Sequence, residues 1–259
     1  MPKGDSVITV GADTTVRESD PGAEQPSQEV AHHLEPVLDM SAAPAYATPC
    51  AKDSTVALWR TGTEWTRLAT IDTEMICEAA QLSPDGRYIA YTEHDRSLYI
   101  AFSTPPPASV RVNHHTDWIT ALAWSPTSQY LATVSDDRTG AVWRVTSTPE
   151  GPHAKLVTTL IGHGNWLDSV AWSPEESQLI TGSADHTARL WIRETGESTA
   201  VLRGHTARVK GVAWSADGTR IATTVLSASR TPGPTARSES SASTGTGSPI
   251  SSGCPPQTR

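Results

Sequence analysis

A histidine, a tryptophan, an aspartate and a second tryptophan recur in this chain at fixed spacing. Two complete sets and the start of a third are present: His115, Trp124, Asp137, Trp143; His163, Trp172, Asp185, Trp191; and His205, Trp214. Self-similarity at a period of about 40 to 45 residues is the signature of a repeat architecture, in which each unit buries its faces against its neighbours. The repeat therefore constrains the fold more than any single motif does.

Two degenerate copies precede these sets. In the nearer copy the four marker positions hold Thr73, Leu82, Asp95 and Ala101. In the earlier copy Asp53 and Trp59 keep the spacing between the aspartate and the second tryptophan, and His32 and His33 lie near the histidine position. The repeat thus extends toward the N-terminus with weakened markers.

Each clear repeat contains short segments that alternate apolar and polar residues, separated by turn signals such as Ser125-Pro126 and Asp217-Gly218. Four such segments per repeat, with a turn every 8 to 12 residues or so, predict an all-β array. The six extra residues between Trp143 and His163 fall in the segment TSTPEGPHA, which is rich in turn formers. We interpret this segment as a loop insertion.

The repeats resemble the WD-repeat β-propeller family, of a bacterial type and apparently incomplete. The dipeptides Gly162-His163 and Gly204-His205, the VAWSP blocks and the Asp-to-Trp spacing that ends at Trp143 and Trp191 carry the resemblance. It implies four-stranded blades around a channel. With about four to five blades in the chain, we expect a partial or open propeller. The block LSPDGRYIAYTEHD also resembles periplasmic and peptidase propellers, but the Gly-His dipeptides favour the WD-repeat family.

The expected organisation has three parts. Residues 31–225 form the blades, and residues 1–30 form an N-terminal segment, which is a remnant of a blade because Val7–Arg17 resembles Leu179–Arg189. Residues 226–259 are rich in Ser, Pro and Gly and are expected to form a disordered tail, since they cannot bury enough apolar surface to offset ordering entropy. The register fails at Ser227, where an aspartate is expected.

The failure of the register leaves three interpretations open. We favour a chain that is a fragment or is frameshifted near Val225. Alternatively, Val209–Val225 pairs with the N-terminal strands in a five-bladed ring, or another chain completes the ring. The last blade is expected to be the weakest part of the fold, because its network lacks the aspartate.

The resemblance implies a hydrogen-bonded chain inside each blade, from His through a Ser or Thr and the turn Asp to Trp. The residues assigned to it are His115, Asp137, Trp143, His163, Ser183, Asp185, Trp191 and His205. The hydroxyl is left open between Thr133 and Ser135 in one blade and between Thr181 and Ser183 in the next. Trp only donates and Asp only accepts, whereas Ser and Thr do both, so such a chain is chemically consistent.

Ser, His and Asp together also suggest a hydrolase triad. A triad occurs once per site, whereas this set recurs with the repeat, and no G-x-S-x-G elbow, P-loop or dinucleotide motif is present. The pairs His32-His33 and His114-His115 suggest a metal, but no Cys or His cluster completes a ligand set. We therefore expect no catalytic residue, no cofactor and no metal.

The functional hypothesis concerns the position three residues after each repeat histidine, which holds Trp118, Trp166 and Arg208. Trp and Arg are enriched in interface hot spots, and the resemblance puts this position near the rim of one propeller face. Asp136 and His94 are weaker candidates on the same surface. The alternative, held at equal weight, is that each Trp caps the apolar edge of its own blade.

Composition restricts the partners. The net charge of −8, without a cluster of Lys and Arg, disfavours nucleic acid. No apolar run is long enough for a membrane span and no signal peptide is evident. Three unpaired cysteines favour reduced thiols and a cytoplasmic protein.

We therefore expect a non-catalytic scaffold that binds proteins or peptides on the propeller top. The alternative is a sensor or regulatory module of a larger signalling, NTPase or kinase assembly, and a propeller enzyme comes third. Fold-level analogy carries most of this inference, since a fold does not define a function.

Overall fold

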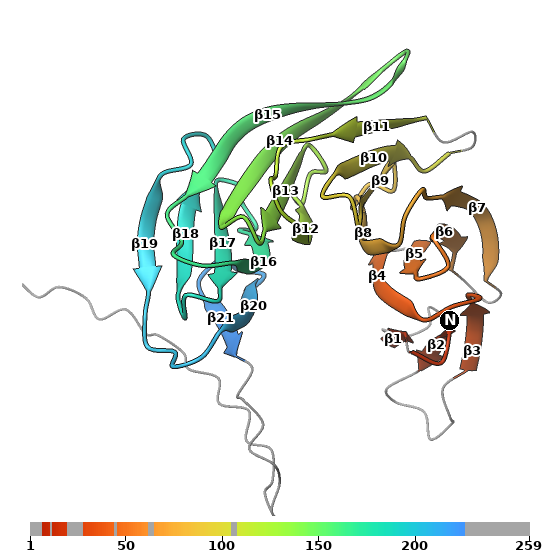
Figure 1. The fold of residues 1–259 in the computed structure, drawn as a ribbon, viewed down its shortest axis with the longest axis horizontal. Coiled ribbons are helices and arrows are strands. Elements are labelled where there is room, and N and C mark those ends of the chain that lie inside the picture. The colour runs from red at the N-terminus through yellow and green to blue at the C-terminus, as the bar shows by residue number, and fades with distance from the viewer. Residues whose placement is uncertain are drawn as a thin grey trace, which may run out of the picture.

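The computed structural model describes residues 7–10, 12–19, 28–43, 46–61, 65–104 and 108–225, and all of its regular elements are β-strands. The strands form six antiparallel sheets placed side by side along an arc (Figure 1). Four sheets have four strands each and are called blades 1 to 4 in chain order. The all-β, blade-built fold expected from the repeat is thus confirmed.

The strands have the following bounds. Blade 1 contains β4 (Val37–Ala43), β5 (Tyr46–Ala51), β6 (Thr55–Arg60) and β7 (Thr66–Asp72). Blade 2 contains β8 (Cys77–Leu82), β9 (Tyr88–Glu93), β10 (Leu98–Phe102) and β11 (Ser109–Val112). Blade 3 contains β12 (Ile119–Trp124), β13 (Tyr130–Ser135), β14 (Thr139–Thr148) and β15 (Gly151–Ile161). Blade 4 contains β16 (Leu167–Trp172), β17 (Gln178–Ser183), β18 (Ala188–Ile192) and β19 (Ser198–Leu202).

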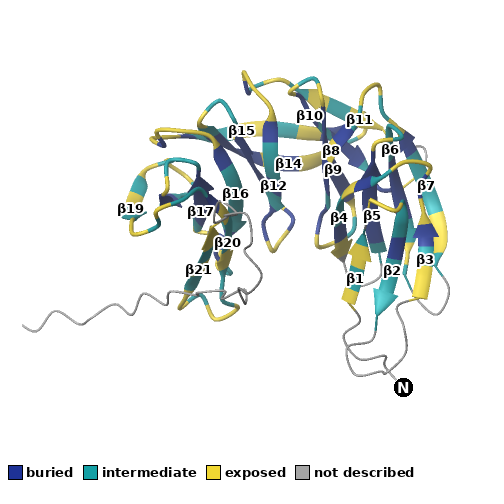
Figure 2. Ribbon diagram, turned by 60° about the horizontal axis from the view of Figure 1, so that its bottom comes forward, coloured by how far each residue is buried: buried dark blue, intermediate teal, exposed yellow. Residues whose placement is uncertain are grey.

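Two smaller sheets stand at the ends of the arc (Figure 1, Figure 2). The N-terminal sheet has three strands, β1 (Val7–Val10), β2 (Thr15–Ser19) and β3 (Gln28–His32). The C-terminal sheet has two, β20 (Val209–Trp214) and β21 (Ile221–Val225). The expected division after residue 30 falls inside β3.

The hydrophobic core lies between blades rather than within them. One cluster joins blade 1 to blade 2, a second joins blade 2 to blade 3, and a third joins blade 3 to blade 4. Trp172 and Trp124, each within an Ala-Trp-Ser-Pro sequence, add a polar link across these boundaries. Trp172 Nε1 donates to the Ala123 carbonyl of blade 3 at 2.8 Å, and Trp124 Nε1 donates to the Gln81 carbonyl of blade 2 at 3.0 Å. Each tryptophan thus buries a large apolar ring and satisfies its only donor in the preceding blade.

The segment expected to be a loop insertion is instead a β-hairpin, so that interpretation was wrong. β14 and β15 pair, with one register shift between Val142 and Trp143, as far as Thr148 opposite Gly151, which leaves a two-residue turn at Pro149-Glu150. The hairpin projects beyond the arc (Figure 1) and contacts blade 2, where the Tyr88 hydroxyl lies 2.6 Å from Ser147 Oγ. The extra residues therefore lengthen the two outer strands of blade 3.

Strand pairing does not close the arc within the described residues. β20 and β21 pair with each other, and the N-terminal sheet lies across the gap at the other end (Figure 1). The five-bladed ring closed by Val209–Val225 is therefore wrong for this structure. Figure 2 shows buried residues concentrated where blades face each other, whereas β21 is intermediate or exposed throughout. The expected disordered tail, residues 226–259, lies outside the described residues.

Candidate functional site

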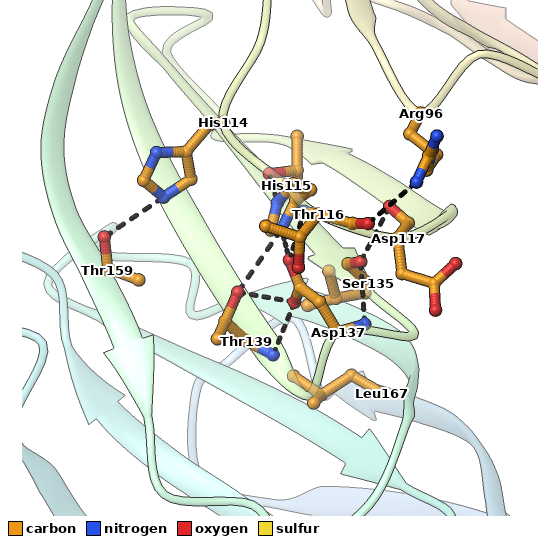
Figure 3. A network of polar contacts seen from close by, with 12 residues as sticks. Arg96, His114, His115, Thr116, Asp117, Ser135, Asp137, Thr139, Thr159 and Leu167 are labelled. Atoms are coloured by element: carbon orange, nitrogen blue, oxygen red, sulfur yellow. Dashed lines mark hydrogen bonds and ion pairs between the residues drawn. The ribbon is translucent and has the colours of Figure 1, made fainter.

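The turn between the second and third strands of blade 3 carries a dense polar network (Figure 3). His115 Nδ1 lies 2.9 Å from Asp137 Oδ2, and its Nε2 lies 2.8 Å from Thr133 Oγ1. Trp143 Nε1 donates to the same Thr133 oxygen at 3.2 Å. Asp137 also accepts from the hydroxyl and the backbone N–H of Thr139, at 2.6 and 2.8 Å. One histidine thus joins the turn to the blade interior.

Blade 4 repeats the arrangement and fixes its proton positions. His163 Nδ1 lies 2.8 Å from Asp185 Oδ2, and Thr181 Oγ1 lies 2.8 Å from both His163 Nε2 and Trp191 Nε1. The ionised Asp185 only accepts, so His163 Nδ1 carries a proton; in the neutral ring, which the lowered pKa of His163 favours, Nε2 then accepts from the Thr181 hydroxyl, whose oxygen accepts from Trp191. The Nδ1–H of His163 thus donates to Asp185.

The charges of this network follow from burial and hydrogen bonding. Burial lowers the pKa of His163 below its ordinary value, against the opposing effect of Asp185, so the neutral ring persists. Burial alone raises the pKa of Asp185, but hydrogen bonds from Thr187, Gly164 N and His163 outweigh it and hold the pKa well below its ordinary value. Asp137 shows the same low pKa for the same reasons. Both aspartates are ionised acceptors.

The structure resolves the choice of hydroxyl in favour of threonine. Ser183, assigned to the chain from sequence, instead donates to the Asn165 carbonyl at 3.1 Å and accepts from the Asp185 backbone N–H at 3.0 Å. Ser135 makes the equivalent contacts to Asp117 and Asp137 in blade 3. The two hydroxyls of each strand therefore have different tasks: the threonine joins His to Trp, and the serine braces the turn.

Blade 1 contains the same network with one member missing. His33 Nδ1 lies 3.1 Å from Asp53 Oδ2, as in the other blades. The position four residues before the aspartate, which is Thr133 in blade 3, holds Pro49. Proline offers no hydroxyl, so His33 Nε2 and Trp59 Nε1 are buried without a hydrogen-bond partner. This is a local defect in an otherwise regular repeat.

Two other copies of the repeat lack one partner of the contact between the histidine and the turn aspartate. In blade 2, Asp95 accepts from the Tyr99 hydroxyl at 2.9 Å and pairs with Arg111 at 2.7 Å, which substitutes for the missing histidine. In the C-terminal sheet His205 Nε2 lies 2.6 Å from Thr223 Oγ1. Ser227, at its aspartate position, lies outside the described residues. The sequence-assigned His205 therefore keeps its threonine contact.

The histidine and aspartate turns all lie at one end of the strands, which we call the top face. It consists of the connections between blades and the turns between the second and third strand of each blade. Trp118 and Trp166 lie there on the connections before β12 and β16, and these residues are 51% and 46% exposed. Such exposure is unusual for Trp, which is highly buried on average.

The Arg208 side chain makes contacts within the protein. Its guanidinium forms a bidentate ion pair with Asp168, whose side chain is 2% exposed, and Lys210 Nζ lies 2.8 Å from the same carboxylate. The guanidinium also lies 5.4 Å from the centre of the Trp166 ring. Sequence reasoning missed this contact between blade 4 and the C-terminal sheet, because Asp168 belongs to no repeat marker.

Acidic residues lie next to Trp118. Asp117 Oδ1 accepts from the Trp118 backbone N–H at 2.9 Å, and the Asp136 N–H donates to the Trp118 carbonyl at 2.9 Å. Burial raises the pKa of Asp136, and the neighbouring Asp117 raises it further. His94 packs edge-on against Trp118 with ring centres 5.4 Å apart. This part of the top face combines aromatic surface with negative charge.

Among the described residues no group of three or more His, Cys, Asp or Glu side chains is arranged to hold a metal ion. None of the described segments forms a helix with the length and apolar character needed to span a bilayer.

The blades and their recurring turn network define an array of β-propeller blades. The sequence profile of the family described as "WD domain, G-beta repeat" matches residues 108–144, 154–191 and 196–231. These three matches support the resemblance of this region to the WD-repeat family. The first two matched segments each begin at or near the outer strand of one blade and end at the third strand of the next.

Curated relatives share part of the repeat region. The chain is 34% identical over 77 residues to Denticleless protein homolog of Danio rerio, which covers 29% of this chain and 12% of that protein. It is 32% identical over 85 residues to Denticleless protein homolog B of Xenopus laevis, covering 32% of this chain and 12% of the relative. The chain therefore spans about an eighth of the length of these curated relatives.

Proposed function

We propose that this protein is a non-catalytic scaffold that binds a protein or peptide partner on the top face, with Trp118 and Trp166 as the main contacts. The observation that carries the proposal is the exposure of two tryptophans at equivalent positions of consecutive blades, 51% and 46%. Neighbouring aromatic side chains on a rigid surface are typical anchors of interfaces. The match to a repeat family and the stacking of the blades into one platform support this function.

The surroundings of the two indoles favour a partner with a basic side chain. The face of Trp166 already holds the guanidinium of Arg208, so this surface accepts a cation. Asp117 and Asp136 lie beside Trp118 and add negative charge. A Lys or Arg of the partner would stack on Trp118 and meet these carboxylates. Arg208 would contribute by positioning Trp166.

Two further features support the proposed setting. The described cysteines, Cys50 and Cys77, are free and buried, which suits the reducing cytoplasm. The acidic top face and the net charge of −8 disfavour a nucleic-acid partner.

A peptide display selection on the purified protein tests the proposal. We expect the enriched peptides to contain Lys or Arg and to lose binding to the variant Trp118→Ala/Trp166→Ala. Leu156→Ala, which removes an exposed apolar side chain from the outer strand of blade 3, is the matched control and should keep binding. Circular dichroism and thermal melting establish folding. Equal capture by the double variant would contradict the proposal, and unfolding would favour the capping role.

A further inference from the structure

We propose a second binding site, on the face opposite the exposed tryptophans, for an acidic peptide segment that carries an aromatic or aliphatic side chain. This bottom face contains the turns between the first and second strands and between the third and fourth strands of each blade. A pocket of about 530 Å³ lies there, between blades 1 and 2 and beside the β14–β15 hairpin. The site goes beyond the proposed top-face function, because it uses none of the same residues.

The pocket has an apolar floor contributed by two blades. Its apolar lining residues are Tyr46, Leu58, Leu68 and Phe102. Phe102 stacks on Tyr88 with ring centres 5.8 Å apart, and Tyr88 in turn stacks on Trp124, so the floor continues into the core between blades 2 and 3. A volume of this size is typical of a preformed ligand pocket. The floor fits one large apolar side chain.

Two arginines line the same pocket, one from each blade. Arg60 ends β6, and Arg87 lies directly before β9. Arg87 is largely exposed, and the Asp85 carboxylate lies 3.6 Å from its Nε, so this guanidinium is only loosely engaged. Among the described residues, the lining contains two cationic groups and no carboxylate. In a chain with 28 acidic and 20 basic residues, this pairing selects for a negatively charged ligand.

Two of the hydroxyl groups in the lining already make contacts within the fold. Ser103 Oγ donates to the Gly86 carbonyl at 2.5 Å, and Ser147 Oγ lies 2.6 Å from the Tyr88 hydroxyl. These contacts fix the turns of blade 2 and the base of the hairpin around the pocket. The charged recognition therefore falls to Arg60 and Arg87 on a preorganised frame.

The placement of the arginines on different blades favours a peptide over a ligand with a single charged head. A peptide with acidic residues on both sides of an apolar one presents separate carboxylates to the two guanidiniums while its apolar side chain enters the floor. A fatty acid presents one carboxylate at the end of its chain.

Isothermal titration with the capped peptide Glu-Glu-Phe-Glu-Glu tests the site in the full chain. We expect binding that Arg60→Gln/Arg87→Gln weakens by about tenfold or more, because charge-assisted hydrogen bonds each contribute more than about 1.4 kcal/mol. Arg203→Gln, an exposed arginine outside the pocket, is the matched control and should bind as the wild type does. Binding should also weaken as salt is raised.

Further ligands and one further variant test the proposal. Equal binding of Gln-Gln-Phe-Gln-Gln would overturn the role of the arginines, and tighter binding of decanoate would identify a small amphipathic anion instead. Absence of binding by the acidic peptide overturns the site. The Trp118→Ala/Trp166→Ala variant should still bind the acidic peptide, so failure of the top-face function and failure of this site are distinguishable.

Discussion

Arg208 and Asp168 form a bidentate ion pair that ties the C-terminal sheet to blade 4. The Asp168 side chain is almost fully buried, so loss of the guanidinium leaves a charge with only Lys210 beside it. We predict that Arg208→Gln destabilises the packing of β20 and β21 by roughly 1–3 kcal/mol, less than a fully buried pair because the arginine is partly exposed. Hydrogen exchange should show faster opening of these two strands alone.

The companion variant separates charge from packing. Asp168→Asn in the Arg208→Gln background removes the buried charge, and we expect it to recover part of the lost protection. If exchange in β20 and β21 is unchanged in the single variant, the ion pair does not hold the sheet.

Pro49→Thr is expected to stabilise the protein. It restores the hydroxyl that His33 Nε2 and Trp59 Nε1 lack, and two buried hydrogen bonds contribute about 1 kcal/mol each. Removing the proline lowers the free energy of unfolding by about 0.4–1 kcal/mol, because the unfolded chain gains conformational entropy. The net gain of about 1 kcal/mol should raise the melting temperature by roughly 2–4 °C.

Pro49→Val is the control for this variant. Valine has the shape of threonine without the hydroxyl, so it should not raise the melting temperature. A gain that is the same for Val and Thr would assign the effect to the strand backbone, where the pairing of β5 with β6 is interrupted between Ala47 and Cys50.

Thr181→Val is predicted to destabilise blade 4 more than Ser183→Ala. The valine leaves two buried groups, His163 Nε2 and Trp191 Nε1, without a partner, at a cost of about 2–4 kcal/mol. The alanine removes one donor to the Asn165 carbonyl and one acceptor for the Asp185 N–H, for which about 1 kcal/mol is expected. Chemical denaturation measures both. The reverse order would assign the central hydroxyl to Ser183.

The protein should lose stability as the pH falls from about 7.5 to about 5.5. Burial lowers the pKa values of His163 and His33 below the ordinary 6.5, so the unfolded chain takes up protons in this range before the folded chain does. The low pKa values of Asp137 and Asp185 change the free energy of unfolding only at more acidic pH, below the ordinary 3.8. Melting temperatures at the two pH values measure the effect, and His163→Gln should reduce the difference.

A melting temperature that rises on acidification would contradict the neutral assignment of His163. Unchanged pH dependence in His163→Gln would place the titrating group elsewhere in the fold.

The spacing of the markers was sufficient to predict the blades and the residues that meet in them. His163, Asp185 and Trp191 come together because a repeated offset in sequence becomes a repeated position in a sheet. The choice between Thr181 and Ser183 was not predictable in this way. Residues two apart on a strand share a face, so only the exact register decides which hydroxyl lies under the histidine.

Two features escaped prediction because they lie outside the repeat. The residues around Pro149 and Gly151 were interpreted as a loop from their turn propensity, yet only Pro149-Glu150 form the turn and the flanking residues pair. The partner of Arg208 lies 40 positions earlier in the chain, at a position where neighbouring blades carry Thr120 and Lys210. No periodic pattern marks such a contact.

The indole of Trp172 reaches back to a carbonyl of blade 3, and that of Trp124 reaches back to blade 2. Each unit is therefore coupled to its nearest neighbours, as in a one-dimensional array whose end members have a single neighbour. Unfolding of such an arc should begin at the ends and advance blade by blade, with a calorimetric transition broader than that of one cooperative unit. On heating, the molecule should unfold first at its terminal sheets and last at blades 2 and 3.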